Sequence, residues 1–287
     1  MKTDTFIEIG SQHQMCEDYI ISGDNYIILA DGCSGSKHSE MGSRFVCYMA
    51  KMYMKLHGVA GIDDFKYYEN LGNWVIHNSD TLTRQLGLDK TCLDATLVVA
   101  YAKDDYVHIC MFGDGYIVMK TAWGDYEIYC VDFKAGSKSM PYYLRYLIDD
   151  EGRKKYHEMK VSKTVNKTTI FSDGTVKNHT IEQAYDNIEF WHLPIGRFKS
   201  ISICSDGLGT FLKPTADETG NKIMNAEDMV PSIFDFKSSA GVFLQRQINM
   251  CKRNMRKLNS PFEHFDDLSI GTFLMEEDPN AKNSKAE

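Results

Sequence analysis

Hydrophobic and polar positions in the first third of the chain predict strands and then helices. Three short apolar runs have strand-like composition, and the turn residues Gly23-Asp24-Asn25 separate the last two. From Met41 to Leu56 apolar residues recur at helical spacing, with Gly58 in the stop position. A second helix is predicted from Asp63, a good N-cap, to Gly87. The predicted strands are Phe6 to Ile9, Asp18 to Ser22 and Tyr26 to Ala30.

The pattern then returns to strands, and one more amphipathic helix is predicted from Ala240 to Leu258. This order fits an α+β fold better than a doubly wound parallel sheet. We therefore expect a sandwich of antiparallel β-sheets flanked by pairs of α-helices. The later predicted strands are Ala95 to Ala102, Tyr106 to Phe112, Tyr116 to Lys120, Asp125 to Val131, a strand near Thr169, Ile188 to Leu193, Ser200 to Cys204 and Leu268 to Leu274.

The 287 residues favour one large domain, residues 1–275. The stretch 133–168 is rich in Lys, Tyr and polar residues and contains a helix-like run from Pro141 to His157, so it is a candidate flap or insertion. The charged tail 276–287 has the composition of a disordered segment.

Composition excludes several classes of protein. The net charge of -8 argues against non-specific binding of nucleic acid or of anionic membranes. The N-terminus lacks the layout of a secretory signal, and no run approaches the ~18 apolar residues of a membrane span. Eight cysteines occur without a Cys-x-x-Cys pair, which indicates reduced thiols rather than a zinc ribbon or a disulfide framework. A soluble cytoplasmic protein is expected.

Five short acidic signatures lie at the edges of the apolar runs. An Asp before Gly at a strand end is, taken singly, most often a turn residue. Carboxylates brought together from several strand ends are what a hard divalent cation requires, so the set as a whole favours metal-assisted hydrolysis. Asp173 is interpreted as a turn residue, because Ser172-Asp173-Gly174 lacks the Leu-Gly-Thr-Phe run that follows Asp206-Gly207. The signatures are Glu17-Asp18, Asp31-Gly32, Gly113-Asp114-Gly115, Ser205-Asp206-Gly207 and Asp266-Asp267.

In their order and spacing, from about Ile9 to Phe273, these motifs resemble the metal-dependent type 2C protein serine/threonine phosphatase (PPM) family. The resemblance implies a central β-sandwich with two Mn²⁺ or Mg²⁺ ions at one end. It also implies hydrolysis of phosphoserine or phosphothreonine by attack of a metal-bridging water or hydroxide, without a covalent intermediate. Oxygen ligands of this kind are the ones that such hard ions favour.

The resemblance also implies a role for each position. Asp31 would bridge both ions, and Asp18 would lie in the same shell or just behind it. Asp114 matches an aspartate that, with Asp206, holds a third ion in some members. The implied metal ligands are Glu17, Asp18, Asp31, the Gly32 carbonyl, Asp114, Asp206 and Asp266, and the implied catalytic residues are Asp31, Asp18 and His13.

Two departures from the family pattern bear on activity. His13 stands where many members have an Arg that grips the substrate phosphate, and a His lacks the bidentate fork. Cys33 stands where eukaryotic members have a His thought to protonate the leaving group. The chain therefore resembles a divergent bacterial-type member. A pseudophosphatase that acts as a regulatory binding module, and a phosphohydrolase of small molecules, remain alternatives.

The expected partners are a phosphoprotein substrate and a cognate Ser/Thr kinase or its targets, in a signalling role and with the protein as a monomer. No nucleic acid or membrane partner is expected. The basic cluster Arg246 to Lys257 could contact a phosphoprotein, although a solvated helix face is the ordinary interpretation of such a cluster. The Tyr-rich run Tyr142 to Tyr146 fits either a cover over the cleft or plain packing.

Overall fold

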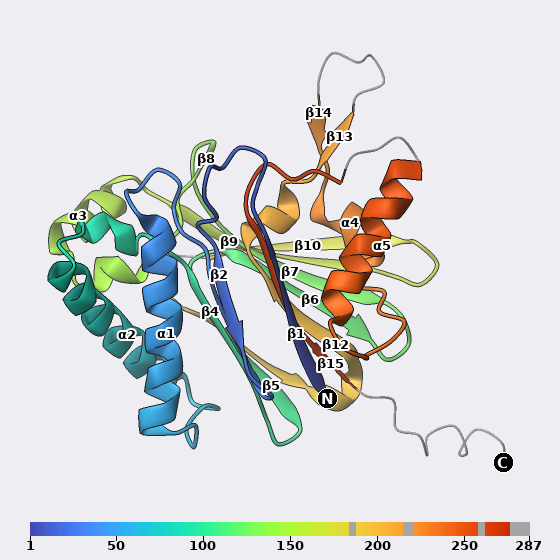
Figure 1. The fold of residues 1–287 in the computed structure, drawn as a ribbon, viewed down its shortest axis with the longest axis horizontal. Helices are drawn as coiled ribbons and strands as arrows, with labels where there is room; N and C mark the ends of the chain where they lie inside the picture. Colours follow the sequence, from blue (N-terminus) through green and yellow to red (C-terminus); the bar gives the residue numbers. More distant parts are fainter. Residues whose placement is uncertain (184–187, 215–220, 258–261, 276–287) are drawn as a thin grey trace.

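Two antiparallel sheets face each other in the structure, a computed structural model that describes residues 1–183, 188–214, 221–257 and 262–275 (Figure 1). The tail 276–287 and Leu258 lie outside the described residues. The larger sheet has the order β1 (Lys2–Glu8), β15 (Leu268–Leu274), β12 (Phe198–Cys204), β6 (Gly115–Thr121), β7 (Tyr126–Ala135), β9 (Ser162–Ile170) and β10 (Val176–Gln183), with β8 (Lys138–Ser139) beside β7. The smaller sheet has the order β11 (Glu189–Pro194), β5 (Tyr106–Phe112), β4 (Leu97–Lys103), β3 (Tyr26–Ala30) and β2 (Tyr19–Ser22).

Strand β3 shows why these apolar runs form a sandwich. Ile27 and Leu29 are fully buried in the core between the two sheets, whereas Ile28 and Ala30 are fully buried in a second core on the opposite face. Successive side chains of a strand point to opposite faces, so a strand that is covered on both sides reads as continuously apolar. The sheets therefore need a layer of helices on each outer face.

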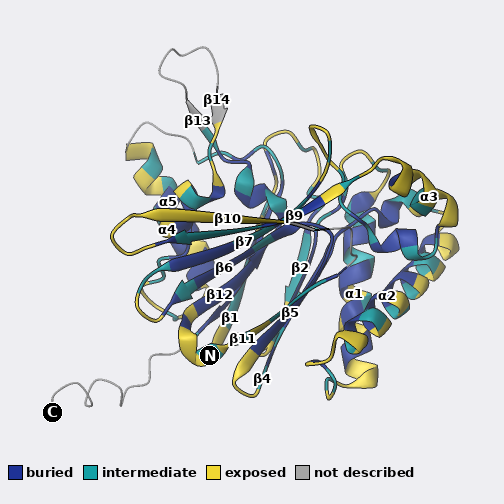
Figure 2. Ribbon diagram, turned by 180° about the vertical axis from the view of Figure 1, so that it is seen from behind, coloured by how far each residue is buried: buried dark blue, intermediate teal, exposed yellow. Residues whose placement is uncertain are grey.

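Paired helices supply those outer layers (Figures 1 and 2). Helices α1 (Ser39–His57) and α2 (Phe65–Gln85) bury residues such as Val46 and Leu71 against the smaller sheet. Helices α4 (Ala226–Ile233) and α5 (Phe243–Lys257) bury Val230 and Ile248 against the larger sheet. The order helix, sheet, sheet, helix confirms the predicted α+β sandwich. Among the described residues, no helix is long and apolar enough to cross a membrane.

Several predicted boundaries were wrong. The N-cap of α2 is Asp64 rather than Asp63, because the Asp64 carboxylate accepts the backbone N–H of Lys66 at 2.9 Å. The run Pro141 to His157 is not one helix: it forms a 3₁₀ turn at Leu144–Leu147 and α3 at Asp150–Glu158. Strand β10, helix α4 and the hairpin of β13 (Leu212–Pro214) and β14 (Asn221–Ile223) were not predicted.

The candidate flap 133–168 divides into two kinds of structure. Its ends belong to the larger sheet, since β7 extends to Ala135 and β9 starts at Ser162. Residues between these strands carry β8, the 3₁₀ turn and α3. Tyr142 and Tyr146 of the Tyr-rich run are buried and pack on Tyr156 of α3, with ring centroids 5.2 and 5.1 Å away.

Candidate active site

The acidic signatures meet where the chain passes between the two sheets. Asp114 lies between β5 of the smaller sheet and β6 of the larger one. Its neighbours Gly113 and Gly115 have φ values of 93° and 137°, which L side chains rarely adopt. A Cβ on Gly115 would also lie 2.8 Å from the Cys204 carbonyl oxygen. The turn therefore requires both glycines, and it directs Asp114 to the end of the sandwich.

Asp31 follows β3 and is fixed by backbone pairing with the start of β4. Its N–H donates to the Thr96 hydroxyl at 3.0 Å, and the Thr96 N–H donates to the Asp31 carbonyl at 2.8 Å. One residue further on, Gly32 pairs with Ala95. A side chain at Gly32 would lie 2.9 Å from the carbonyl oxygens of Glu17 and Ser39, so the loop closes tightly around this position.

Asp206 and Asp266 come from the larger sheet. Asp206 follows β12, and Gly207 packs so closely on the preceding turn of β15 that a Cβ there would lie 1.9 Å from the Asp267 carbonyl oxygen. The Ser205 hydroxyl donates to that same oxygen at 3.2 Å and accepts the N–H of Ser269 at 3.0 Å. These contacts hold Asp206 beside Asp266.

Five of the seven predicted metal ligands line one cavity of about 160 Å³, namely Asp31, Gly32, Asp114, Asp206 and Asp266. Cys33, Thr96, Ser139 and Tyr143 line it as well. The other two predicted ligands do not line it. Asp18 is fully buried, and Glu17 has an exposed side-chain fraction of 17%.

The carboxylates of this site are partly or fully buried, and among the described residues only His13 faces one of them as a possible cation. Burial, with repulsion from Asp18 and Asp206, raises the pKa of Asp31 well above its ordinary value, and the pKa of Asp114 rises for the same kind of reason. Burial and the charge of Asp266 raise the pKa of Asp206 to about 6. The cluster is therefore poised to gain stability from added positive charge.

Asp18 is the most deeply buried member of the cluster. Neither of its carboxylate oxygens has a hydrogen-bond partner of good geometry among the described residues. Burial raises its pKa to about 7, although the nearby hydroxyls of Ser269 and Ser205 oppose that rise. Asp206 also has one buried oxygen without a partner in the described part of the chain. Such atoms are costly unless another donor or a cation satisfies them.

His13 lies among carboxylates rather than in an open phosphate pocket. Its Nδ1 is 3.1 Å from Asp267 Oδ2 and 3.8 Å from Glu17 Oε2, and its Nε2 is 3.4 Å from Asp266 Oδ1. Burial lowers the pKa of His13, but the close Asp267 carboxylate and the surrounding negative charge outweigh that effect and raise the pKa overall. The structure thus places His13 beside Asp266, one of the residues that line the cavity.

Asp267 organises this side of the site, a role that the sequence analysis did not assign to it. It is almost fully buried, and its two oxygens accept the backbone N–H groups of Gly10 at 2.7 Å and Glu17 at 2.6 Å. The ligand atoms of His13, Glu17 and Asp267 lie within 4.8 Å of one another. Because both Asp267 oxygens already accept N–H groups, we interpret this residue as a support for the loop before β2.

A second acidic residue, Asp94, belongs to a segment of the family resemblance but was given no role in the sequence analysis. Asp94 accepts hydrogen bonds from the Ser36 hydroxyl at 2.8 Å and from Nε of the buried Arg145 at 2.6 Å. Arg145 also contacts Asp149. This network ties the loop after Asp31 to the segment that carries Tyr143. The only sequence signal was a single Arg within a Tyr-rich run.

Asp173 and Cys33, which the sequence analysis also discussed, lie on the surface and at the cavity respectively. Asp173 is an exposed turn residue whose carboxylate accepts the Thr175 N–H at 2.8 Å, which confirms its interpretation as a turn. Cys33 lines the cavity as a free thiol, and the other seven cysteines are also free.

Comparison with known families matches residues 10–241 to the protein phosphatase 2C family. The chain belongs to this family. It is a protein serine/threonine phosphatase by that membership, and the pseudophosphatase alternative gains no support. The comparison with curated proteins finds no match.

Solved structures of protein phosphatase 2C type share the fold. A bacterial serine phosphatase matches with a TM-score of 0.53 at 14% identity, over 97% of this chain and 99% of its own. PppA, a regulatory component of the type VI secretion system of Pseudomonas aeruginosa, matches with a TM-score of 0.53 at 12% identity, over 96% and 97% of the two chains. The Mycobacterium tuberculosis serine/threonine phosphatase PstP matches with a TM-score of 0.51 at 14% identity, over 96% and 99%.

Proposed function

We propose that this phosphatase hydrolyses phosphoserine and phosphothreonine in proteins with the help of two divalent cations, Mn²⁺ or Mg²⁺. One observation carries the proposal. Carboxylates from both sheets converge on a single small cavity, and among the described residues only His13 brings a cationic side chain into contact with them.

The donor set fits hard divalent ions. Four carboxylates line the cavity, those of Asp31, Asp114, Asp206 and Asp266, and one Asp206 oxygen has no hydrogen-bond partner among the described residues. Mg²⁺ and Mn²⁺ favour such oxygen ligands, whereas the neighbouring Cys33 would suit a softer metal. The ions would be held by Asp31, Asp206 and Asp266, with Glu17, Asp18 and the Gly32 carbonyl on the side of the smaller sheet and Asp114 available for a third ion.

Bound divalent cations would lower the pKa of a water molecule, orient it toward phosphorus and offset charge on the phosphoryl oxygens. The chain's own residues prepare the site for that chemistry. Thr96 fixes the backbone of Asp31, and Asp267 fixes the loop that carries His13 and Glu17. When protonated, His13 reduces repulsion between Asp266 and Asp267.

The substrate class and partners follow from the same proposal. A cavity of about 160 Å³ has room for a phosphoryl group but not for a large ligand, so the rest of the substrate must lie outside it. A phosphoprotein and its cognate Ser/Thr kinase are the partners that we propose, with the protein acting in signalling. A small-molecule phosphohydrolase is the alternative, and it would not turn over a phosphopeptide.

The proposal is tested by hydrolysis of p-nitrophenyl phosphate and of a phosphothreonine peptide, with Mn²⁺ and with EDTA. We expect turnover that requires Mn²⁺ and is lost in Asp31→Asn and Asp206→Asn. Asp173→Asn is the matched control, because it alters an Asp-Gly turn that lies on the surface, and it should leave turnover unchanged. A wild-type protein that binds Mn²⁺ but hydrolyses neither substrate would overturn the proposal.

A further inference from the structure

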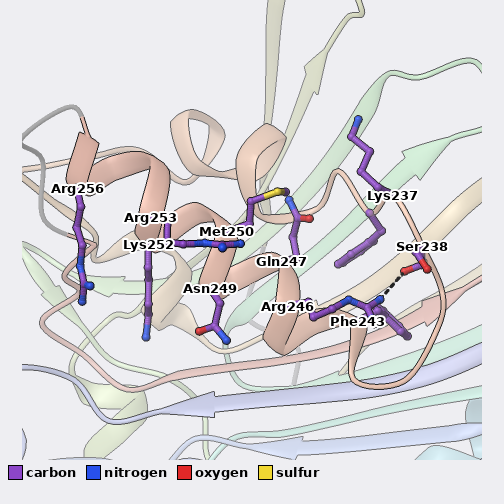
Figure 3. Close-up of a pocket in the computed structure, with 11 residues that line it drawn as sticks. Lys237, Ser238, Phe243, Arg246, Gln247, Asn249, Met250, Lys252, Arg253 and Arg256 are labelled. Atoms are coloured by element: carbon purple, nitrogen blue, oxygen red, sulfur yellow. Dashed lines mark hydrogen bonds between the residues drawn. The ribbon is translucent and has the colours of Figure 1, made fainter.

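Helix α5 carries a basic groove on a protein whose net charge is -8. The groove has a volume of about 590 Å³, and none of the described residues that line it is a carboxylate. Its cationic lining residues are Lys237, Arg246, Lys252, Arg253 and Arg256 (Figure 3). The groove is separate from the 160 Å³ cavity and shares no lining residue with it.

The basic residues form a stripe along one side of the helix. Arg246, Arg253 and Arg256 are separated by seven and three positions, spacings that return to the same face of an α-helix. Ten residues of helix span about 15 Å. An extended peptide advances about 3.3 Å per residue, so about five residues would match the length of the stripe.

Arg253 and Arg256 differ from the other basic residues of the groove in having no partner among the described residues. Lys252 pairs with Glu8 at 2.5 Å, Lys237 pairs with Asp235, and Arg246 donates to the Ser238 carbonyl at 3.3 Å. Arg253 and Arg256 are exposed, and none of the described residues forms an ion pair or a hydrogen bond with either side chain. Their guanidinium groups are free to bind carboxylates in bidentate geometry.

The groove is not purely polar. Phe236, Phe243 and Met250 also line it, and the rings of Phe236 and Phe243 meet edge to face at 5.2 Å. This mixture of guanidinium groups and apolar surface fits a peptide that alternates acidic and apolar side chains. It suits nucleic acid or an anionic membrane less well, because the overall negative charge would repel both over longer distances.

A short series of contacts connects the groove with the metal centre. Lys252 binds Glu8, the other oxygen of Glu8 lies 3.7 Å from His264 Nε2, and His264 Nδ1 lies 2.6 Å from the Asp266 carbonyl oxygen. Asp266 lines the cavity that we assign to the metals. Glu8 and His264 therefore link the groove to the side of the metal centre that Asp266 forms.

We propose that the α5 groove is a docking site for an acidic segment, with an apolar anchor, of the phosphoprotein substrate. The substrate part of this statement rests on the proposed function, whereas binding of the acidic segment does not. Arg253 and Arg256 would contact the acidic side chains, and the Phe236 and Met250 surface would receive the apolar one.

Binding is tested first without any phosphate or metal. The probe is a fluorescein-labelled seven-residue peptide with a central phenylalanine between glutamates, titrated by fluorescence anisotropy. We expect the double variant Arg253→Glu/Arg256→Glu to weaken binding at least about tenfold, because attraction becomes repulsion. Lys55→Glu/Lys154→Glu is the matched control, since it makes the same change of charge at exposed positions of α1 and α3 and should bind as wild type does.

Turnover is tested next. For a phosphothreonine peptide joined to the acidic segment, the Arg253/Arg256 variant should raise KM about tenfold and leave kcat unchanged. Hydrolysis of p-nitrophenyl phosphate, which carries no acidic segment to bind the groove, should not change. If p-nitrophenyl phosphate and the phosphopeptide are inert with every variant, the proposed function fails while the anisotropy result still decides the docking site.

Three results would overturn the docking site. The first is no measurable binding of the acidic peptide to wild type. The second is an equal loss of binding in the Lys55/Lys154 control, which would indicate non-specific charge attraction. The third is tighter binding of a single-stranded RNA oligomer or of phosphatidylserine vesicles than of the peptide, which would assign the groove to another class of partner.

Discussion

Two groups of carboxylates that are partly or fully buried differ in what balances their charge. Asp94 and Asp149 have Arg145 between them, and Lys90 Nζ lies 2.9 Å from Asp149. Burial alone would raise the pKa of Asp149, but these partners hold it below its ordinary value. Asp31 and Asp114 have no such cation among the described residues, and burial raises the pKa of both.

The difference separates a structural role from a ligand role. A carboxylate that joins two segments is matched by a side chain of the protein, which completes the pair when the chain folds. A carboxylate that binds an external cation must be left without one. The four predictions below test this contrast, from the largest expected effect to the smallest.

Removing the internal cation should destabilise the protein strongly. Arg145→Met leaves Asp94 and Asp149 buried without their shared partner, and we expect a loss of about 3–5 kcal/mol in the free energy of unfolding. Urea denaturation measures it. Arg153→Met removes an exposed ion pair with Asp150 and should cost less than about 1 kcal/mol. Equal effects of the two substitutions would contradict the contrast.

Removing a carboxylate from the other group should have the opposite effect on stability. Without metal, Asp31→Asn should stabilise the protein on the order of 1 kcal/mol at pH 7, because it relieves repulsion within the cluster. In the same variant, Mn²⁺ should no longer raise the Tm as it does in wild type. Its kcat should be about 10²- to 10³-fold lower than that of wild type. Asp94→Asn is the control, and it should destabilise with or without Mn²⁺. A destabilised metal-free Asp31→Asn protein would refute the idea.

Asp267 stands between the two groups, since it is buried beside the metal centre but satisfied by N–H donors. Asp267→Ala would leave the N–H groups of Gly10 and Glu17 without an acceptor, which should cost about 1–3 kcal/mol in stability. It should also lower kcat/KM about 10- to 100-fold by loosening Glu17 and His13. Urea denaturation and steady-state kinetics measure these effects. Asp267→Asn keeps one acceptor and should recover part of both losses; no recovery would show that charge alone matters.

Glu8 is a partly exposed carboxylate that is paired with cationic side chains of the protein. The nearby His264 ring lowers the pKa of Glu8, burial opposes that effect, and Lys252 lowers the pKa further. Ionised Glu8 therefore stabilises the folded state above about pH 4.5, and this contribution is lost as the pH falls through the lowered pKa. Glu8→Gln should flatten the pH dependence of stability below pH 4.5 by less than about 1 kcal/mol, as measured by urea denaturation at several pH values. The control Glu69→Gln, in an exposed pair with Lys66, should not flatten it.

Much of the fold was predictable because burial on two sides leaves a clear record in the sequence. The runs that became β3 and β5 are apolar at nearly every position, and the α1 pattern repeats at helical spacing. Strand β10 was missed because it lies at the edge of the larger sheet and exposes Val176 and Ile181, so its sequence carries few apolar positions. Helix α4 is only eight residues long and contains Pro231.

Only those residues of the candidate site that lie in recognisable turns could be predicted from the sequence. Asp-Gly signatures at strand ends pointed to Asp31 and Asp206, because such turns recur where strands leave a sheet. The partner of a buried charge leaves no local signal. Arg145 lies 51 residues from Asp94, and Asp267 is 250 residues from the N–H group of Glu17 that it accepts. Such pairings depend on tertiary packing, which a single sequence does not record.

The crossing of the chain between the sheets at Asp114 has a mechanical consequence. Asp31 follows β3 of the smaller sheet and Asp206 follows β12 of the larger one. A cation bound by both residues would therefore cross-link the two sheets. Any motion that slides one sheet over the other would have to break this cross-link. Metal binding should therefore slow hydrogen exchange in β3 and β12 together, far beyond the loops that touch the ions.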